Sequence, residues 1–254
     1  MISPVISQII QSFSDSRHAL ILLFKLRLWK YFAIPILIAL LTAAAIVALA
    51  WGLSGKVGDL IAQAWIWEWG TSTIRSLAQL IGGLIVFTIG LLIYKHIVLA
   101  LSAPFMSPVS ERIEAHLYPG VHQYRNTTNV SQLMRGLKIN LRNLYWEIGM
   151  SIPILLIGLI PVVGFFSAAI IFFIQAYYAG FGSIDCTLER HFGFRESVRF
   201  VKSNRGAAIG NGIIFTLLLF IPFIGTFLVL PIAVTAGAVT TLRLINGGDA
   251  KTLA

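Results

Sequence analysis

The sequence predicts an all-α integral membrane protein, and three observations support this fold class. Of the 254 residues, 57% are apolar and only 11% are charged, whereas a typical soluble domain carries about 25% charged residues. Two stretches with almost no charge are long enough to cross a bilayer. Two further apolar stretches are each interrupted by proline and glycine. We expect one membrane domain over residues 1–254.

The first predicted transmembrane helix covers residues 31–51, about 20 residues without a charge. At 1.5 Å rise per residue, its length matches the hydrocarbon thickness of about 30 Å. A connection with Trp65, Trp67 and Trp69 follows. Tryptophans of this kind settle at the headgroup level, so this connection is expected to mark the far membrane surface.

The second predicted transmembrane helix covers residues 77–103 and contains two neighbouring ionisable side chains, Lys95 and His96. Ionisable groups within a span are functional candidates by default, here for a polar pathway. They also lie about two helical turns before Pro104, close enough for their ends to reach the membrane surface. Both interpretations are open, and we favour the second.

An internal repeat marks the second half of the chain. The segment Leu159-Ile-Pro-Val-Val-Gly164 is echoed by Phe220-Ile-Pro-Phe-Ile-Gly225, each within an apolar stretch. Proline removes a helical hydrogen bond and glycine permits left-handed backbone angles, so each motif should interrupt a helix. Residues 148–181 and 207–242 are therefore predicted to form two helical hairpins.

The lengths of the arms bear on how deeply these hairpins insert. Residues 148–160 would form a helix of about 20 Å, which falls short of the hydrocarbon thickness. We therefore predict hairpins that enter the membrane partly and turn back; four ordinary spans with tight turns are the alternative. Polar backbone at a turn within lipid must be covered by protein or water, which implies a homo-oligomer or a pore.

The distribution of basic residues predicts the orientation. Of the 19 Lys and Arg residues, only two, Lys56 and Arg75, lie between the two long spans. Because cytoplasmic loops are enriched in Lys and Arg, this connection is expected to be periplasmic. Both termini and the surface segments 104–147 and 182–206 are then cytoplasmic, in a multi-pass protein of a bacterial inner membrane.

Basic residues at roughly helical spacing alternate with apolar ones in the second surface segment. The basic members are Arg190, Arg195, Arg199 and Lys202. This pattern is typical of interfacial amphipathic helices that lie on anionic lipid. A vestibule for an anion is the weaker alternative.

Three cations stand just before the first span: Lys25, Arg27 and Lys30. A small anion needs several convergent donors, because burying its charge without pairing is costly. A helix N-terminus supplies N–H groups, and these cations supply charge, so together they could bind such an anion. The alternative is that they anchor the helix by contacting lipid phosphates.

Other chemistries have no support in the sequence. The histidines lack metal-ligand spacing, and neither a catalytic nucleophile set nor a phosphate-binding loop is present, so we expect no enzyme, metal or cofactor. The net charge of +9 is explained by loop topology and a bilayer partner, and no nucleic-acid recognition motif accompanies it.

Several short segments occur in a characteristic order along nearly the whole chain. They are the two Ile-Pro-x-x-Gly motifs, Leu101-Ser-Ala-Pro-Phe105, Glu111-Arg-Ile-Glu114, Phe194-Arg-Glu196 and Leu230-Pro-Ile-Ala-Val-Thr-Ala-Gly237. In this succession the chain resembles the bacterial CysZ sulfate permeases, which are related to the eukaryotic etoposide-induced membrane proteins.

The resemblance implies two long spanning helices, two partly inserted hairpins, and an oligomer that passes sulfate inward without ATP hydrolysis. In that family a Gly-hydrophobic-Arg-Arg segment before the first span binds the anion. Here the matching segment reads Arg27-Leu-Trp-Lys-Tyr31, so Trp29 and Lys30 stand where the two arginines would fall. Sulfate uptake is the expected function, and a non-transporting oligomeric scaffold of the same fold is the alternative.

Overall fold

The computed structural model describes residues 4–63, 71–120, 128–158, 161–221 and 224–247, and the chain is helical nearly throughout these ranges. This confirms the all-α class. The described helices, in chain order, are α1 (Pro4–Lys25), the short 3-10 helix η1 (Leu28–Tyr31), α2 (Ala33–Ala62), α3 (Thr71–Leu117), α4 (Asn129–Ile157), α5 (Pro161–Leu188), α6 (Phe194–Ser203), α7 (Arg205–Leu219) and α8 (Ile224–Asn246).

Four described helical segments are long and apolar enough to cross a membrane, which indicates a multi-pass membrane protein. They are Ala33–Ala62, Leu92–Leu117, Val163–Leu188 and Phe227–Asn246. The most apolar window of the first has only 17% of its residues buried inside the protein. Because its outward surface is apolar, lipid is the environment that this helix requires.

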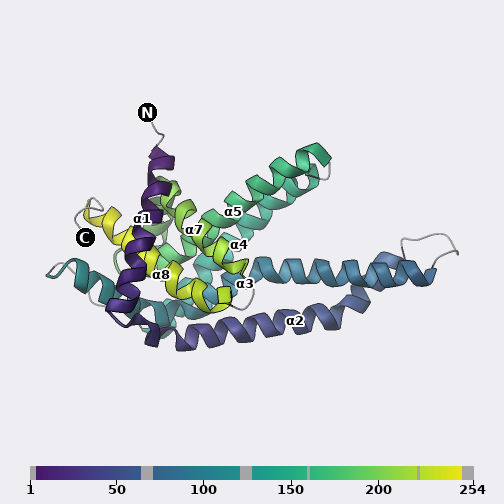
Figure 1. The fold of residues 1–254 in the computed structure, drawn as a ribbon, viewed down its shortest axis with the longest axis horizontal. Helices are drawn as coiled ribbons and strands as arrows, with labels where there is room; N and C mark the ends of the chain where they lie inside the picture. The colour runs from purple at the N-terminus through teal and green to yellow at the C-terminus, as the bar shows by residue number, and fades with distance from the viewer. Residues whose placement is uncertain (1–3, 64–70, 121–127, 159–160, 222–223, 248–254) are drawn as a thin grey trace.

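Helices α2 and α3 form a long arm that extends away from the rest of the molecule (Figure 1). Their backbones approach closely at glycines: a Cβ at Gly58 would lie 2.5 Å from the Cα of Gln79, and one at Gly90 would lie 2.4 Å from a methyl carbon of Ile46. Small residues permit such contacts between membrane helices. The tryptophan-rich connection predicted at the tip lies outside the described residues.

The long helices extend further than expected. Helix α2 continues past residue 51 to Ala62, and α3 passes through Pro104 and Pro108 to Leu117. We expected a surface segment from residue 104 onward, but buried residues of this part of α3, including Met106 and Val109, pack into the core. This packing offsets the loss of a hydrogen bond at each proline, so the helix continues.

Both Ile-Pro-x-x-Gly motifs coincide with interruptions between helices. Helix α4 ends at Ile157 and α5 begins at Pro161, while α7 ends at Leu219 and α8 begins at Ile224. The α4–α5 pair extends from the body as a second, shorter arm (Figure 1). The depth to which either pair enters a membrane remains a prediction.

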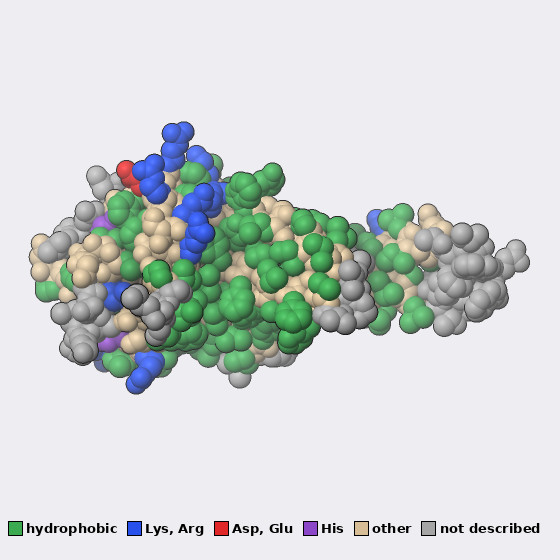
Figure 2. Space-filling view, turned by 90° about the horizontal axis from the view of Figure 1, so that it is seen from above, with side chains coloured by type: hydrophobic (Ala, Val, Ile, Leu, Met, Phe, Trp, Pro, Cys, Tyr) green, Lys and Arg blue, Asp and Glu red, His purple; other side chains and the backbone are tan. Residues whose placement is uncertain are grey.

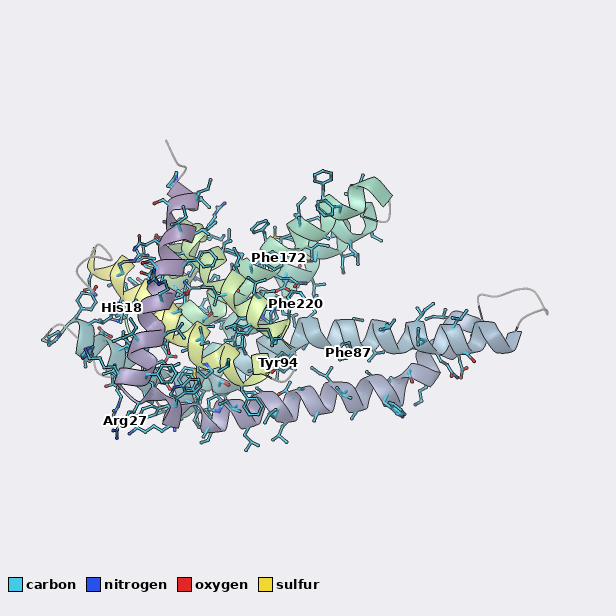
Figure 3. The ribbon with its side chains drawn as sticks, viewed as in Figure 1. His18, Arg27, Phe87, Tyr94, Phe172 and Phe220 are labelled. Atoms are coloured by element: carbon cyan, nitrogen blue, oxygen red, sulfur yellow. The ribbon has the colours of Figure 1, made fainter. Side chains whose placement is uncertain are left out.

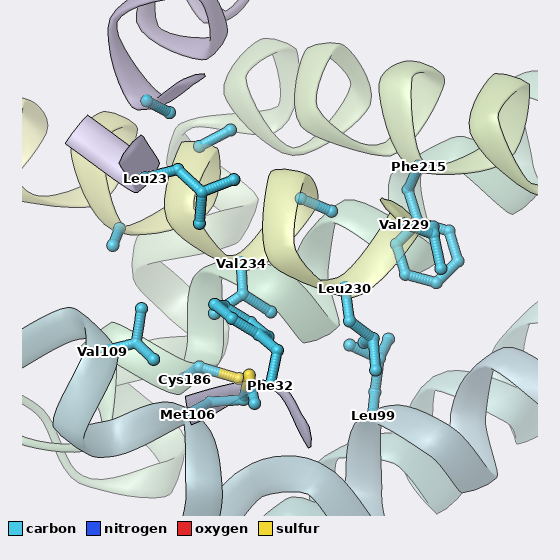
Figure 4. Packing of buried hydrophobic residues seen from close by; sticks show 14 of the residues in the cluster. Leu23, Phe32, Leu99, Met106, Val109, Cys186, Phe215, Val229, Leu230 and Val234 are labelled. Carbon is cyan, nitrogen blue, oxygen red and sulfur yellow. The ribbon is translucent and has the colours of Figure 1, made fainter. Parts of the chain in front are cut away.

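Helices α1, α7 and α8 pack together with parts of α3 and α5 in the body of the molecule (Figure 1). At the centre of the body, Phe32 and Leu230 are fully buried among side chains from α1, α3 and α5 (Figure 4). The glycines Gly206 and Gly210 of α7 face the backbone of α1, with a Cβ at Gly206 only 2.2 Å from the Val5 carbonyl oxygen. This pair of glycines is thus a packing face between α7 and α1.

Hydrophobic side chains also cover much of the outer surface. Figure 2 shows them over one face of the body and along the arm, while Lys and Arg side chains gather on a limited part of the body. Large apolar side chains are strongly exposed on the arms, among them Trp51 at 86% and Phe165 at 77%. Patches of this size mark surfaces in contact with lipid or with other protein.

Candidate functional site

The predicted anion-binding residues lie at the sharp turn between α1 and α2. Arg27 has φ 50° and ψ 45°, a left-handed conformation that is uncommon for a residue with a side chain. The neighbouring Leu28 and Phe32 are fully buried and hold the turn against the body. Lys25, Arg27 and Lys30 are exposed on this turn, and Figure 3 shows Arg27 at the outer edge of the body.

A fourth cation reaches the same turn from another helix. The Nζ of Lys30 lies 5.3 Å from the ring centroid of Tyr31, and the guanidinium carbon of Arg112, on α3, lies 5.2 Å from the same centroid. Both distances are within the range of cation–π attraction. We call Lys25, Arg27, Lys30 and Arg112 the turn cluster. The sequence did not predict that Arg112 reaches this turn, because Arg112 is far from Tyr31 along the chain.

Lys95 and His96 are buried inside the protein, with 4% and 3% of their surfaces exposed. The Lys95 ammonium donates to Glu147 Oε1 at 2.7 Å and to the Gln175 carbonyl at 3.2 Å. His96 Nε2 lies 3.0 Å from Glu147 Oε2. The structure therefore differs from the favoured prediction that these side chains reach the membrane surface, because Glu147 on α4 supplies a partner inside.

A cavity of about 250 Å³ opens beside this buried triad, Lys95, His96 and Glu147. Its lining comes from α3, α5 and the C-terminal end of α7: Leu92, Lys95, Gln175, Phe215, Thr216, Leu219 and Phe220. The lining thus combines a few polar side chains, among them Lys95 and Gln175, with mostly apolar ones. Since an ammonium has three donors and Lys95 uses two of them on described residues, one N–H remains for a small polar guest.

Three other basic residues expected at the surface form buried or partly buried ion pairs. Arg135 binds Asp185 at 3.0 Å, and Arg243 binds Asp15 at 2.9 Å. Arg190 pairs with Glu114 and has only 2% of its side chain exposed. The expectation that Arg190 belongs to a lipid-facing basic helix is therefore wrong for this residue, because α6 begins only at Phe194 and Arg190 is paired with α3.

Helix α6 itself carries the remaining members of that basic pattern. Arg195, Arg199 and Lys202 are exposed, while Val201 is buried. Aromatic side chains next to them pack onto the protein: Phe194 and Phe200 contact a buried core cluster, and the ring of Phe200 lies 5.4 Å from that of Phe192. The apolar side of this helix is thus at least partly covered by the chain itself.

Glu189 is a further buried acid next to these ion pairs. Burial raises its pKa from 4.5 to about 7, and nearby Asp185 adds to the shift, despite the opposing charges of Arg135 and Arg190. The carboxyl of Glu189 is therefore protonated over a substantial part of the near-neutral range.

Residues 17–231 match the family model described as sulfate transporter CysZ/etoposide-induced protein 2.4. The chain belongs to this family. The match covers the turn cluster, the buried triad and both Ile-Pro-x-x-Gly motifs, and it confirms the resemblance inferred from short segments. No curated protein matches the chain closely enough to be counted as a relative.

The CysZ/etoposide-induced protein family includes sulfate transporters. Within this context, the structure presents two cationic sites of different character. The turn cluster consists of four exposed basic side chains, whereas the buried triad pairs its lysine with a carboxylate. Within the part of the chain that the structure describes, none of the four basic side chains of the turn cluster is paired with a carboxylate.

Proposed function

We propose that the protein is a permease or channel for a small inorganic anion, with sulfate as the substrate, in a bacterial inner membrane. The observation that carries this proposal is the turn cluster in a member of a family that includes sulfate transporters. Arg27 is held in an unfavourable backbone conformation by buried neighbours on the same turn. Strained residues of this kind occur preferentially at functional sites.

The chemistry of the turn cluster suits a tetrahedral dianion. Guanidinium and ammonium groups donate charge-assisted hydrogen bonds, which are roughly twice as strong as neutral ones. The α1–α2 turn also brings the start of α2 close to Arg27, and the first N–H groups of a helix have no partner within it. Trp29 and Lys30 replace the family's arginine pair, and Arg112 on α3 compensates in part for the lost guanidinium.

The buried triad and its cavity are our candidate for a later stage of the passage. Lys95 offers a donor at the cavity wall, and Glu147 compensates its charge when no anion is present. A permeating anion would meet a site with one cation already paired, so its binding there would be weak. Weak binding inside a pathway favours release and hence conduction.

We propose that both termini are cytoplasmic and that the two helix pairs α4–α5 and α7–α8 enter the membrane only partly. Such pairs leave polar backbone at their turns, which neighbouring copies in a homo-oligomer would shelter. The depth can be measured with cysteines at Phe166 and, as a reference on the long arm, at Trp51. Labelling of Phe166→Cys by a membrane-impermeant maleimide only from the periplasmic side would contradict partial insertion.

Flux into vesicles tests the proposed function directly. Purified protein in liposomes should take up labelled sulfate faster than empty vesicles, and excess unlabelled sulfate should compete with the label. Heat-denatured protein in the same lipids is the control for leakage. The measurement is the initial rate of uptake at several sulfate concentrations.

A non-transporting oligomeric scaffold is the second candidate, because the exposed apolar arms suit assembly as well as lipid contact. The two candidates give opposite results in the same vesicles. Sulfate, phosphate and chloride uptake all equal to that of empty vesicles, with correctly folded protein, would reject the permease and favour the scaffold.

A further inference from the structure

Helix α1 turns polar groups toward the protein. Gln8 Oε1 accepts a hydrogen bond from the Gly206 backbone N–H at 3.1 Å, and Ser12 Oγ donates to the Ala207 carbonyl at 3.3 Å. The single acid of the helix, Asp15, is 1% exposed and binds Arg243 on α8. Gln8, Ser12 and Asp15 on this face thus bind groups of α7 and α8.

The opposite side of α1 is apolar and uncovered. Its exposed members recur at intervals of three or four residues or their multiples, so they share one arc of the helix. They are Ile6 (51% exposed), Ile10 (57%), Phe13 (41%), Leu20 (38%), Ile21 (62%) and Phe24 (65%). A helix with polar groups inside and large apolar groups outside is not suited to water.

A third arc lies beside the apolar one and is polar. Ser7, Ser14 and Lys25 are exposed, and His18 is half-buried. Because Asp15 is paired inside, the formal charges that α1 exposes are the positive ones of Arg17 and Lys25. The helix therefore presents separate surfaces to the protein, to an apolar phase and to water.

We propose that α1 lies in the headgroup layer of an anionic lipid bilayer, with the Ile6–Phe24 arc in contact with acyl chains. A helix whose apolar arc borders a polar arc, with basic residues and no free acid, has the pattern of interfacial helices on anionic lipid. Helix α1 has 22 residues. It is not among the described helices that are long and apolar enough to span the membrane, which agrees with a position along the surface.

The arrangement in space agrees with this position. Helix α1 lies across the body, crosswise to the α2–α3 arm that is apolar enough to enter the membrane (Figure 1). His18, from the polar arc, lies on the side of α1 that is away from the far end of this arm (Figure 3). When the arm crosses the bilayer, α1 thus runs along its surface with the polar arc toward water.

Arg17 favours lipid over a second copy of the chain as the occupant of this surface. It is exposed and falls in the same arc as Phe13 and Ile21. A lipid surface accommodates an arginine there, because the long side chain reaches a phosphate while its stem stays among apolar groups. A protein surface would need an acid at this point, and the one acid of α1 is already buried.

Site-directed fluorescence quenching tests the proposal on the full chain. Single cysteines at Phe13 and Ile21, and at Ser14 and His18 as neighbours on the same helix, would carry an environment-sensitive fluorophore. The parent protein, whose only cysteine, Cys186, is buried, controls for background labelling. The vesicles contain phosphatidylcholine and phosphatidylglycerol, with a nitroxide on the upper acyl chain as lipid quencher and iodide as aqueous quencher.

The expected result is a contrast between neighbours. Probes at Phe13→Cys and Ile21→Cys should be quenched several-fold more by the lipid nitroxide than by iodide, and probes at Ser14→Cys and His18→Cys should show the reverse. Equal access of all four to iodide would overturn the proposal. Protection of the labelled Phe13→Cys and Ile21→Cys from both quenchers, with disulfide-linked dimers formed by the same variants without label in the same lipids, would assign the surface to a second copy instead.

Discussion

The turn cluster and the buried triad use the same kind of residue in opposite electrostatic settings. At the turn, Arg27 and Lys30 are exposed, and Lys30 and Arg112 each lie within cation–π distance of the Tyr31 ring. In the interior, Lys95 is compensated by Glu147 at 2.7 Å. The difference teaches that charge count alone does not locate an anion site. What matters is which cations are left without a carboxylate.

Removing the carboxylate of the buried triad should have the largest effect on folding. In Glu147→Gln, Lys95 would remain buried without its countercharge, and breaking a buried pair in this way typically costs about 3–5 kcal/mol. We expect a large fall in the thermal unfolding midpoint in detergent. The measurement is thermal unfolding followed by circular dichroism.

The double variant Lys95→Met/Glu147→Leu is the matched control for that prediction. It removes both charges at once, and apolar replacements of a buried pair are often neutral for stability. We expect it to recover most of the lost stability. A double variant as unstable as Glu147→Gln would show that packing, and not the ion pair, controls this site.

Relief of backbone strain at Arg27 should have a smaller effect on the free energy of unfolding, and this effect should be stabilising. Arg27→Gly allows the left-handed conformation without a Cβ clash, whereas Arg27→Ala keeps the clash and removes the same charge. We expect the glycine variant to be more stable than the alanine variant by about 1 kcal/mol. Both should lose sulfate affinity. Equal unfolding midpoints for the two variants would argue that the turn is not strained.

A third prediction concerns the pH dependence of stability at Glu189, a carboxyl buried next to Asp185. Its folded pKa of about 7 lies above the unfolded value of 4.5. The folded state therefore holds the extra proton, so this group's contribution to stability is full below about pH 4.5 and is lost as pH rises through 7.

The variant Glu189→Gln stays neutral at every pH, so its stability should lack the pH dependence that Glu189 contributes. Its unfolding midpoint should match that of the parent near pH 4 and exceed it by a few degrees near pH 8. Paired melting curves across this range give the comparison. A constant difference between the two proteins at all pH values would contradict the raised pKa.

The sequence allowed some features to be predicted because their cause is local. Proline and glycine in each Ile-Pro-x-x-Gly motif act on their own backbone, and the helices indeed stop at Ile157 and Leu219 and resume at Pro161 and Ile224. The same local reasoning was wrong at Pro104. There the helix continues because residues after the proline pack into the core.

Features that depend on distant contacts were harder to predict. Glu147 was missed as the partner of Lys95, although a single acid next to an apolar run is a usable signal for a buried pair. Arg112 and the pair between Asp15 and Arg243 had no local signal at all. Their partners lie tens to hundreds of residues away, so the tertiary fold alone brings them together.

Equilibrium binding of labelled sulfate to the purified protein tests the central claim, that the exposed turn cluster and not the buried triad captures the anion. Arg27→Gln/Lys30→Gln should bind sulfate at least about 100-fold more weakly, since it removes two charged donors and each charge-assisted hydrogen bond is worth about 1.5–3 kcal/mol. Lys56→Gln, an exposed cation near the other end of α2, should bind like the parent. Unchanged sulfate affinity in the folded Arg27→Gln/Lys30→Gln variant would contradict the claim.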